Sequence, residues 1–169
     1  TILGLGMYAL PAAILASGFM QELSKRQFVV TWGMVAKVPF FGSLDAEKIA
    51  EIAALLKPWA VPACYTVIRR GEAADSMYFI VSGDVEVDLP PNSFHLTTGE
   101  YFGEMGIVSR SARVANVISI TACQLLILQA RDLNRLLEDN PALAAELTEL
   151  TERRLARSES SESDDQKEP

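Results

Sequence analysis

The chain has 169 residues, of which 49% are hydrophobic, and its formal net charge is −7 at pH 7. This length suffices for one domain with its own core plus an additional element. The sequence has no clustered basic face, which argues against a nucleic-acid-binding surface. The two cysteines and the single histidine, His95, lack the spacing of a metal site or a nucleophile–base pair, so we expect neither a metal nor an enzyme.

The N-terminal segment is uncharged and predicts a membrane-spanning helix. Residues 1–21 reach the length of about 20 apolar residues that a bilayer requires, and many are small enough for close helix packing. Lys25 and Arg26 follow, so the positive-inside bias places the chain after about residue 24 in the cytoplasm. Two alternatives remain open: a signal peptide cleaved near "ILASG", and a buried helix of a soluble protein.

Two helices are predicted next. Residues 23–38, "LSKRQFVVTWGMVAKV", place apolar residues three or four positions apart, which predicts an amphipathic linker helix. Asp45 is suited to cap a second helix, "DAEKIAEIAALL", and we expect Pro58 to end it.

The character of the sequence changes between Trp59 and Ala130. Short runs of β-branched and aromatic residues alternate there with turns, which predicts an antiparallel sandwich or roll. "SGD" at 82–84 separates two of these runs and predicts a hairpin turn. Glycines fall at the breaks, where a positive φ is easiest for this residue: Gly71, Gly83, Gly99 and Gly103.

Two more helices and an acidic tail complete the chain. "RDLNRLLEDN" predicts a short helix, and Pro141 opens a longer one that runs to Arg157. The longer helix carries one apolar stripe, formed by Leu143, Leu147, Leu150 and Leu155. Ser158–Pro169 holds five acidic residues, one lysine and no aliphatic or aromatic residue, so we expect it to be disordered.

The stretch "YFGEMGIVSRSARVANV" from Tyr101 to Val117 holds the strongest candidate site. Gly103 opens a turn that predicts a short helix, Glu104–Val108, whose free N–H groups suit an anion. Arg113 follows on the next predicted strand and can grip phosphate oxygens with its guanidinium fork. A carboxylate would repel a phosphate, so Glu104 should bind a hydroxyl; phosphate and hydroxyl together suggest a nucleotide. The alternative is a structural ion pair of Arg113 with Glu104 or Glu100.

These residues resemble the cyclic nucleotide-binding domain family. The resemblance rests on "IRRGEAADSMYFIVSGDVEV" and "GEYFGEMGIVSRSARVANV" and covers about residues 38–154. It implies an α+β fold, an eight-stranded, jelly-roll-like antiparallel β-roll flanked by helices. It also implies that Arg113, Gly103 and the backbone from Glu104 to Ile107 meet a cyclic phosphate, while Glu104 takes the ribose 2′-hydroxyl. The residues that this implies as the nucleotide site are Gly103, Glu104, Met105, Gly106, Ile107, Arg113 and Val114.

The same resemblance assigns the last helix as a lid over the purine. Thr148, Leu150 and Thr151 lie in the matching turns and are the candidate purine contacts, with Arg153 and Arg154 one turn later. The site departs from the family pattern in two places. Val114 stands where many relatives have Thr or Ser, which favours cAMP over cGMP, and Ala112 stands where the family usually has Pro.

The N-terminal segment is similar to the end of the pore-lining helix of bacterial cyclic-nucleotide-regulated potassium channels, most clearly in "AILASGF". This implies a homotetrameric channel in the plasma membrane, with lipid around residues 1–21 and no nucleic-acid partner. The implied organisation is a pore-helix end at 1–23, a helical linker at 24–38, a cyclic nucleotide-binding domain at 39–157 and an acidic tail at 158–169. The alternative is a membrane-tethered domain of this fold that binds no nucleotide and serves as an interaction module.

Overall fold

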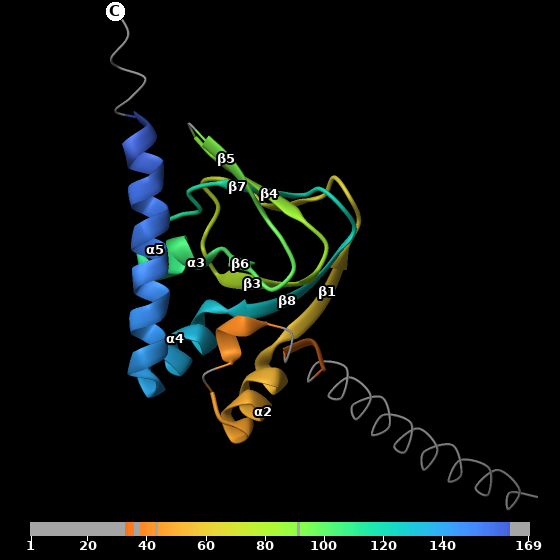
Figure 1. The fold of residues 1–169 in the computed structure, drawn as a ribbon, viewed down its shortest axis with the longest axis vertical. Helices are drawn as coiled ribbons and strands as arrows, with labels where there is room; N and C mark the ends of the chain where they lie inside the picture. The colour runs from red at the N-terminus through yellow and green to blue at the C-terminus, as the bar shows by residue number, and fades with distance from the viewer. Residues whose placement is uncertain (1–32, 36–37, 43, 91, 163–169) are drawn as a thin grey trace, which may run out of the picture.

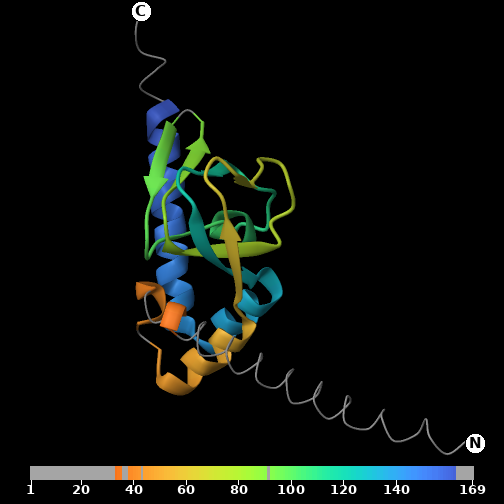
Figure 2. The same ribbon diagram turned by 90° about the vertical axis from the view of Figure 1, so that its right-hand side faces the viewer.

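The computed structural model describes residues 33–35, 38–42, 44–90 and 92–162. In this part of the chain, two four-stranded antiparallel sheets fold against each other as a roll, and helices cover one end and one side (Figures 1 and 2). The first sheet contains, in spatial order, β1 (Lys57–Val61), β8 (Cys123–Gln129), β3 (Ser76–Ser82) and β6 (Tyr101–Phe102). The second contains β2 (Thr66–Ile68), β7 (Asn116–Ser119), β4 (Val85–Leu89) and β5 (Asn92–Leu96). The helical elements are the 3₁₀ turn η1 (Pro39–Phe41), α2 (Ala46–Leu55), α3 (Glu104–Val108), α4 (Ala130–Asp139) and α5 (Pro141–Glu162). The predicted α+β roll with flanking helices is confirmed.

The helix before the roll begins where the sequence predicts and ends earlier. The side chain of Asp45 caps α2 by accepting a hydrogen bond from the backbone N–H of Lys48 at 2.9 Å. However, α2 ends at Leu55, and Pro58 lies inside β1. This strand is at the edge of its sheet, where a residue without a backbone N–H is tolerated.

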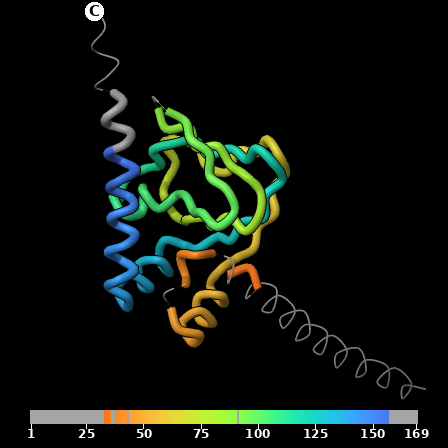
Figure 3. Tube along the Cα trace, viewed as in Figure 1, coloured from red at the N-terminus to blue at the C-terminus, as the bar shows by residue number. Residues whose placement is uncertain are grey.

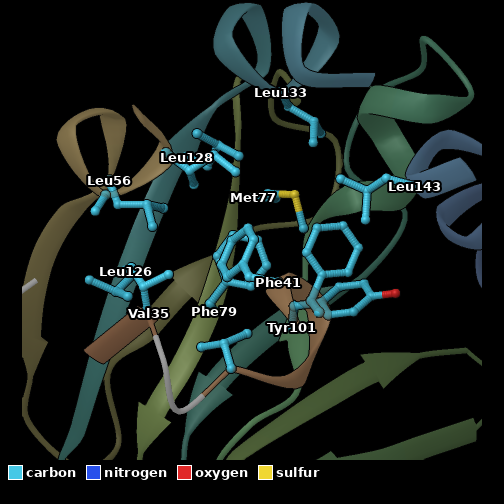
Figure 4. Close-up of a cluster of buried hydrophobic side chains, with 14 of the residues drawn as sticks. Val35, Phe41, Leu56, Met77, Phe79, Tyr101, Leu126, Leu128, Leu133 and Leu143 are labelled. Carbon is cyan, nitrogen blue, oxygen red and sulfur yellow. The ribbon is translucent and has the colours of Figure 1, made fainter. Parts of the chain in front are cut away.

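The first sheet is buried on both faces. Along β3, Met77 and Phe79 contribute to a core under the helices, whereas Tyr78 and Ile80 contribute to a second core between the two sheets. Neighbouring strand residues point to opposite faces, so both faces of β3 need apolar side chains. Figure 4 shows the core under the helices, which draws residues from η1, α2, β3, β6, β8, α4 and α5.

The predicted hairpin at "SGD" is wrong. β3 pairs with β6 and β8 in the first sheet, whereas β4 pairs with β5 and β7 in the second, so residues 82–84 form a corner between sheets. Gly83 has φ +93°, and a Cβ there would lie 2.6 Å from the carbonyl oxygen of Ala122. Glycine is needed at this corner because the corner packs against the connection between β7 and β8, where Ala122 lies.

The two C-terminal helices follow one another directly (Figure 3). Both were predicted, and the apolar stripe of α5 faces the roll. Leu143 and Leu147 are buried in the core under the helices, and Leu150 packs against that core. Leu155 packs against the core between the two sheets. α5 continues to Glu162, so residues 158–162, which the sequence predicts to be disordered, are helical. Figure 1 shows α5 running along the side of the roll, next to α3.

Several predictions fall outside the described residues. These are the membrane span at 1–21, most of the linker helix at 24–38 and the tail from residue 163. Of the helices in the described ranges, none combines the length and apolar character that crossing a bilayer requires.

Candidate functional site

The short helix α3 is built on two glycines that have close neighbours. Gly103 precedes it with φ +88°, and a Cβ there would lie 2.9 Å from Arg113 Nη1. A Cβ at Gly106 would lie 2.6 Å from the Cβ of Ala74. A side chain at either position would therefore force α3 away from its neighbours, and both residues belong to the predicted site.

Arg113 lies in the segment before β7, whereas the sequence predicted it on the strand itself. Its side chain is 6% exposed overall and reaches back to α3, where Nη1 donates a 2.8 Å hydrogen bond to the carbonyl oxygen of Gly103. Nη2 lies 3.3 Å from Asp75 Oδ1, and the guanidinium carbon lies 5.9 Å from the ring centroid of Tyr78. In the described part of the chain, the ion-pair partner of Arg113 is thus Asp75, and neither Glu104 nor Glu100 takes that place.

Glu104 is the first residue of α3, and only 1% of it is exposed. One carboxylate oxygen, Oε1, accepts a 2.6 Å hydrogen bond from Arg154 Nη1. The other, Oε2, is buried and has no hydrogen-bond partner among the residues that the structure describes. Burial raises the pKa of Glu104 above its ordinary value of 4.5, while Arg154 and Arg113 act in the opposite direction. A buried acceptor of this kind favours a ligand that donates a hydrogen bond.

One pocket joins these groups. Its polar lining comes from Glu104, Arg113 and Arg154, and its apolar wall comes mainly from the second sheet and the adjoining strands. The apolar wall consists of Ile68, Val87, Phe94, Leu96, Phe102, Ala115 and Val117. The space between these side chains is about 30 Å³, which is room for about two water molecules. The pocket is partly open to solvent, and this volume describes its narrow inner space.

Six of the seven residues that the sequence predicts for the site line this pocket: Gly103, Glu104, Met105, Gly106, Arg113 and Val114. The seventh, Ile107, is on the other side of α3. Its side chain is buried in the core under the helices. In a helix of one and a half turns the side chains face different ways, and that of Ile107 faces away from the pocket.

The three predicted purine contacts of the last helix do not line the pocket. Thr148 is exposed and donates to the carbonyl oxygen of Ala144, and Thr151 is buried and donates to that of Leu147. Leu150 packs against the core under the helices.

Arg154 is the α5 residue that reaches the pocket. It lies four positions after Leu150 and seven after Leu147, on the apolar stripe of the helix. A basic residue on a buried stripe is the signal in the sequence that identifies it. Arg153, its neighbour, pairs instead with Glu149 on the exposed face. None of the described residues forms a cluster of three or more His, Cys, Asp or Glu that could hold a metal.

Comparisons with known proteins agree with this geometry. Residues 59–140 match the family model described as "Cyclic nucleotide-binding domain". The chain is 41% identical over 141 residues to a protein of Rhizobium etli named cyclic nucleotide-gated potassium channel, covering 83% of this chain and 40% of the relative. It is 40% identical, over 83% of its length and 39% of the relative's, to a protein of the same name from Mesorhizobium japonicum. The chain thus spans about two fifths of the length of these relatives.

A solved structure of cAMP-bound PfPKA-R superimposes with a TM-score of 0.69 at 19% sequence identity, covering 82% of this chain and 47% of that one. At this identity the likeness concerns the fold alone, and it confirms the roll with flanking helices.

Proposed function

Residues 59–140 belong to the cyclic nucleotide-binding domain family, and from this premise we propose that the pocket binds a cyclic nucleotide, with cAMP preferred to cGMP. We further propose that the chain is the cytoplasmic gating region of a cyclic nucleotide-gated potassium channel, in which nucleotide binding is coupled to pore opening. The names of the relatives from Rhizobium etli and Mesorhizobium japonicum support the channel assignment. The whole channel, its homotetrameric assembly, its potassium selectivity and its place in the plasma membrane belong to the same proposal.

The observation that carries the binding proposal is the pairing of a buried cation with a buried, unpartnered carboxylate oxygen in one pocket. Arg113 and Glu104 Oε2 provide the two groups. A cyclic nucleotide offers a complement to each: an anionic phosphate for the guanidinium, and a ribose 2′-hydroxyl that can donate to Oε2. Its purine is flat and largely apolar, and it would lie against the apolar wall near Val114.

We propose that the pocket widens on binding, because its inner space of about 30 Å³ is smaller than a nucleotide. The side chain of Arg154 occupies the pocket from the α5 side and would have to move. A ligand can shift an equilibrium only by its difference in affinity for the two states. We therefore propose that nucleotide binding repositions α5, and that this movement is passed through the linker at residues 24–38 to the pore helix.

One alternative function has an observation in its favour. Arg113 and Glu104 already have partners within the chain, Asp75 and Arg154, so the pocket is largely satisfied without a ligand. A domain that binds no nucleotide and serves as a membrane-tethered interaction module would look the same at these two residues. The unpartnered Oε2 of Glu104 argues for the nucleotide.

Isothermal titration of the whole chain in mild detergent, first with cAMP and then with cGMP, separates the two functions. We expect micromolar or tighter binding that is stronger for cAMP. Replacing Arg113 with Ala should weaken binding by about 2 kcal/mol, or roughly 30-fold, because charged hydrogen bonds are lost at a desolvated site. Arg69→Ala is the matched control, since Arg69 is exposed and does not line the pocket. Absence of heat and of competition with both nucleotides would favour the interaction module.

A further inference from the structure

The ring of Tyr101 lies between the N-terminal turn η1 and the lid helix α5. On one side, its centroid is 5.0 Å from that of Phe40, with the two rings inclined at 61°. On the other, the guanidinium carbon of Arg154 lies 5.2 Å from the same centroid. One aromatic ring therefore contacts both the segment that follows the linker and the helix that closes the pocket.

One nitrogen of Arg154 contacts both the pocket residue Glu104 and Tyr101. Its Nη1 donates to Glu104 Oε1 at 2.6 Å and to the backbone carbonyl oxygen of Tyr101 at 3.1 Å. A ligand that draws this guanidinium away from Glu104 therefore also disturbs its contacts with Tyr101. The two contacts are coupled, because the same nitrogen makes both hydrogen bonds and its movement changes the geometry of each.

The side chain of Tyr101 contributes packing contacts rather than hydrogen bonds. It is 7% exposed, and in the described chain its hydroxyl is buried without a hydrogen-bond partner. Burial raises its pKa to about 12, so the ring stays neutral and its face attracts a cation. Figure 4 shows the ring at the margin of the core under the helices, with the hydroxyl pointing away from that core.

We propose that Tyr101 is the positioning residue that couples the lid to η1. With Arg154 over its face, the ring is held against Phe40. When Arg154 leaves, the ring loses the cation and can reorient, which changes the packing of η1 and of the chain segment before it. This inference rests on the proposed function for the event that moves Arg154, but the coupling itself needs no nucleotide. The element with two states is the Arg154 side chain, bound to Glu104 or released.

Hydrogen exchange in the whole chain tests the coupling. The amides of Phe41, Gly42 and Leu44 report on η1, because each is hydrogen-bonded to a backbone carbonyl in or beside this turn. We expect Arg154→Met, without nucleotide, to change their exchange rates by about fivefold or more, the lower range of allosteric couplings. We expect saturating cAMP to change the same amides in the unmutated chain.

In Tyr101→Leu both changes should be lost, whereas Tyr101→Phe should preserve them, because the hydroxyl has no partner to lose. Phe40→Leu interrupts the same contact from the other side and serves if Tyr101→Leu does not fold, which thermal melts would reveal. Persistence of the η1 response in Tyr101→Leu or in a folded Phe40→Leu overturns the proposal, as does its loss in Tyr101→Phe. A chain that binds no cAMP but whose Arg154→Met response still depends on Tyr101 supports the coupling and refutes only the proposed ligand.

Discussion

Arg154 and Glu104 are 50 positions apart in the sequence, and their side chains meet at 2.6 Å in the wall of the pocket. The exposure of the two side chains is unequal, at 22% for the arginine and 1% for the carboxylate. The contact joins α5 to α3, so the proposed lid helix is held onto the roll by the acidic residue that is also the candidate for binding a ribose hydroxyl. The attachment of α5 to the roll and the proposed recognition of a ribose hydroxyl thus depend on one carboxylate.

The first prediction concerns the strength of this pair. Arg154→Met keeps an unbranched, flexible side chain and removes the charge, which leaves the buried carboxylate of Glu104 without its cation. The free energy of unfolding should fall by about 1–3 kcal/mol, the cost of an unsatisfied buried acceptor. Urea unfolding of the variant and of the unmutated chain measures the difference.

A double-mutant cycle isolates the interaction from other effects of the substitution. In Glu104→Gln, the change Arg154→Met should cost less than in the unmutated chain, by about 0.5–3 kcal/mol. Arg153→Met provides the matched control, because Arg153 pairs with Glu149 on the exposed face and such pairs contribute about 0.3–0.5 kcal/mol. Additive losses at the two positions would show that the pair contributes nothing to stability.

The second prediction is a pH dependence that originates at Glu104. Burial raises its pKa in the folded chain above 4.5, so over the interval between the two pKa values the folded state holds a proton that the unfolded state has released. The free energy of unfolding should therefore fall as the pH rises through this interval and level off above the folded-state pKa. Melting temperatures of the unmutated chain and of Glu104→Gln, compared from about pH 4.5 upward, should diverge in favour of the variant.

Glu100→Gln is the control for this pH series, because Glu100 is exposed. Its melting curve should keep the pH slope of the unmutated chain. A Glu104→Gln variant with the same slope as the unmutated chain would contradict the assignment of the pH dependence to the buried carboxylate.

The third prediction separates backbone strain from crowding at Gly103. Gly103→Ala and Gly71→Ala both place a side chain at φ +88°, at a cost of about 1–2 kcal/mol each. Only at Gly103 would the new Cβ meet neighbours, among them Arg113 Nη1 at 2.9 Å, whereas at Gly71 nothing lies within 4 Å. Thermal unfolding should show an additional loss of about 1 kcal/mol or more for Gly103→Ala. Cyclic AMP binding should fall in this variant alone, since Arg113 is displaced; equal effects at the two glycines would count against the close packing.

The fourth prediction concerns nucleotide preference. Val114 is half-buried in the pocket lining, directly after Arg113. Val114→Thr supplies a hydroxyl whose hydrogen bond to the ligand should add about 0.5–1.5 kcal/mol of binding free energy, with a larger gain for cGMP than for cAMP. Competition titration measures both affinities. Val67→Thr is the control, because Val67 is also half-buried but does not line the pocket, and unchanged selectivity in Val114→Thr would refute the role of this position.

The parts of the fold that were predictable from the sequence depend on local signals. Gly103 and the helix Glu104–Val108 were predicted at their observed positions, because a positive φ followed by a helix start is encoded in adjacent residues. All four glycines assigned to the breaks do have positive φ, Gly71, Gly83, Gly99 and Gly103. The N-cap at Asp45 was predictable for the same reason.

The features that the sequence did not predict depend on contacts between distant segments. A turn at Gly83 could be read from the sequence, but whether the strands that it joins pair together depends on which sheet each one enters. Arg154 was noted only as a neighbour of the predicted lid residues, because its place over Glu104 depends on how α5 packs on α3. The partner of Arg113 was missed in the same way, since Asp75 precedes a strand 38 residues away.

The burial of the first sheet on both faces also bears on where this domain can be cut. The family match runs from residue 59 to residue 140. The outer face of the first sheet, which includes Phe79 and Leu126, is covered by η1, α2 and α5, and these elements lie outside that range. A fragment trimmed to the matched residues would expose this apolar surface to water, where such patches promote aggregation. The recognisable sequence is thus shorter than the segment needed to cover both faces of the first sheet.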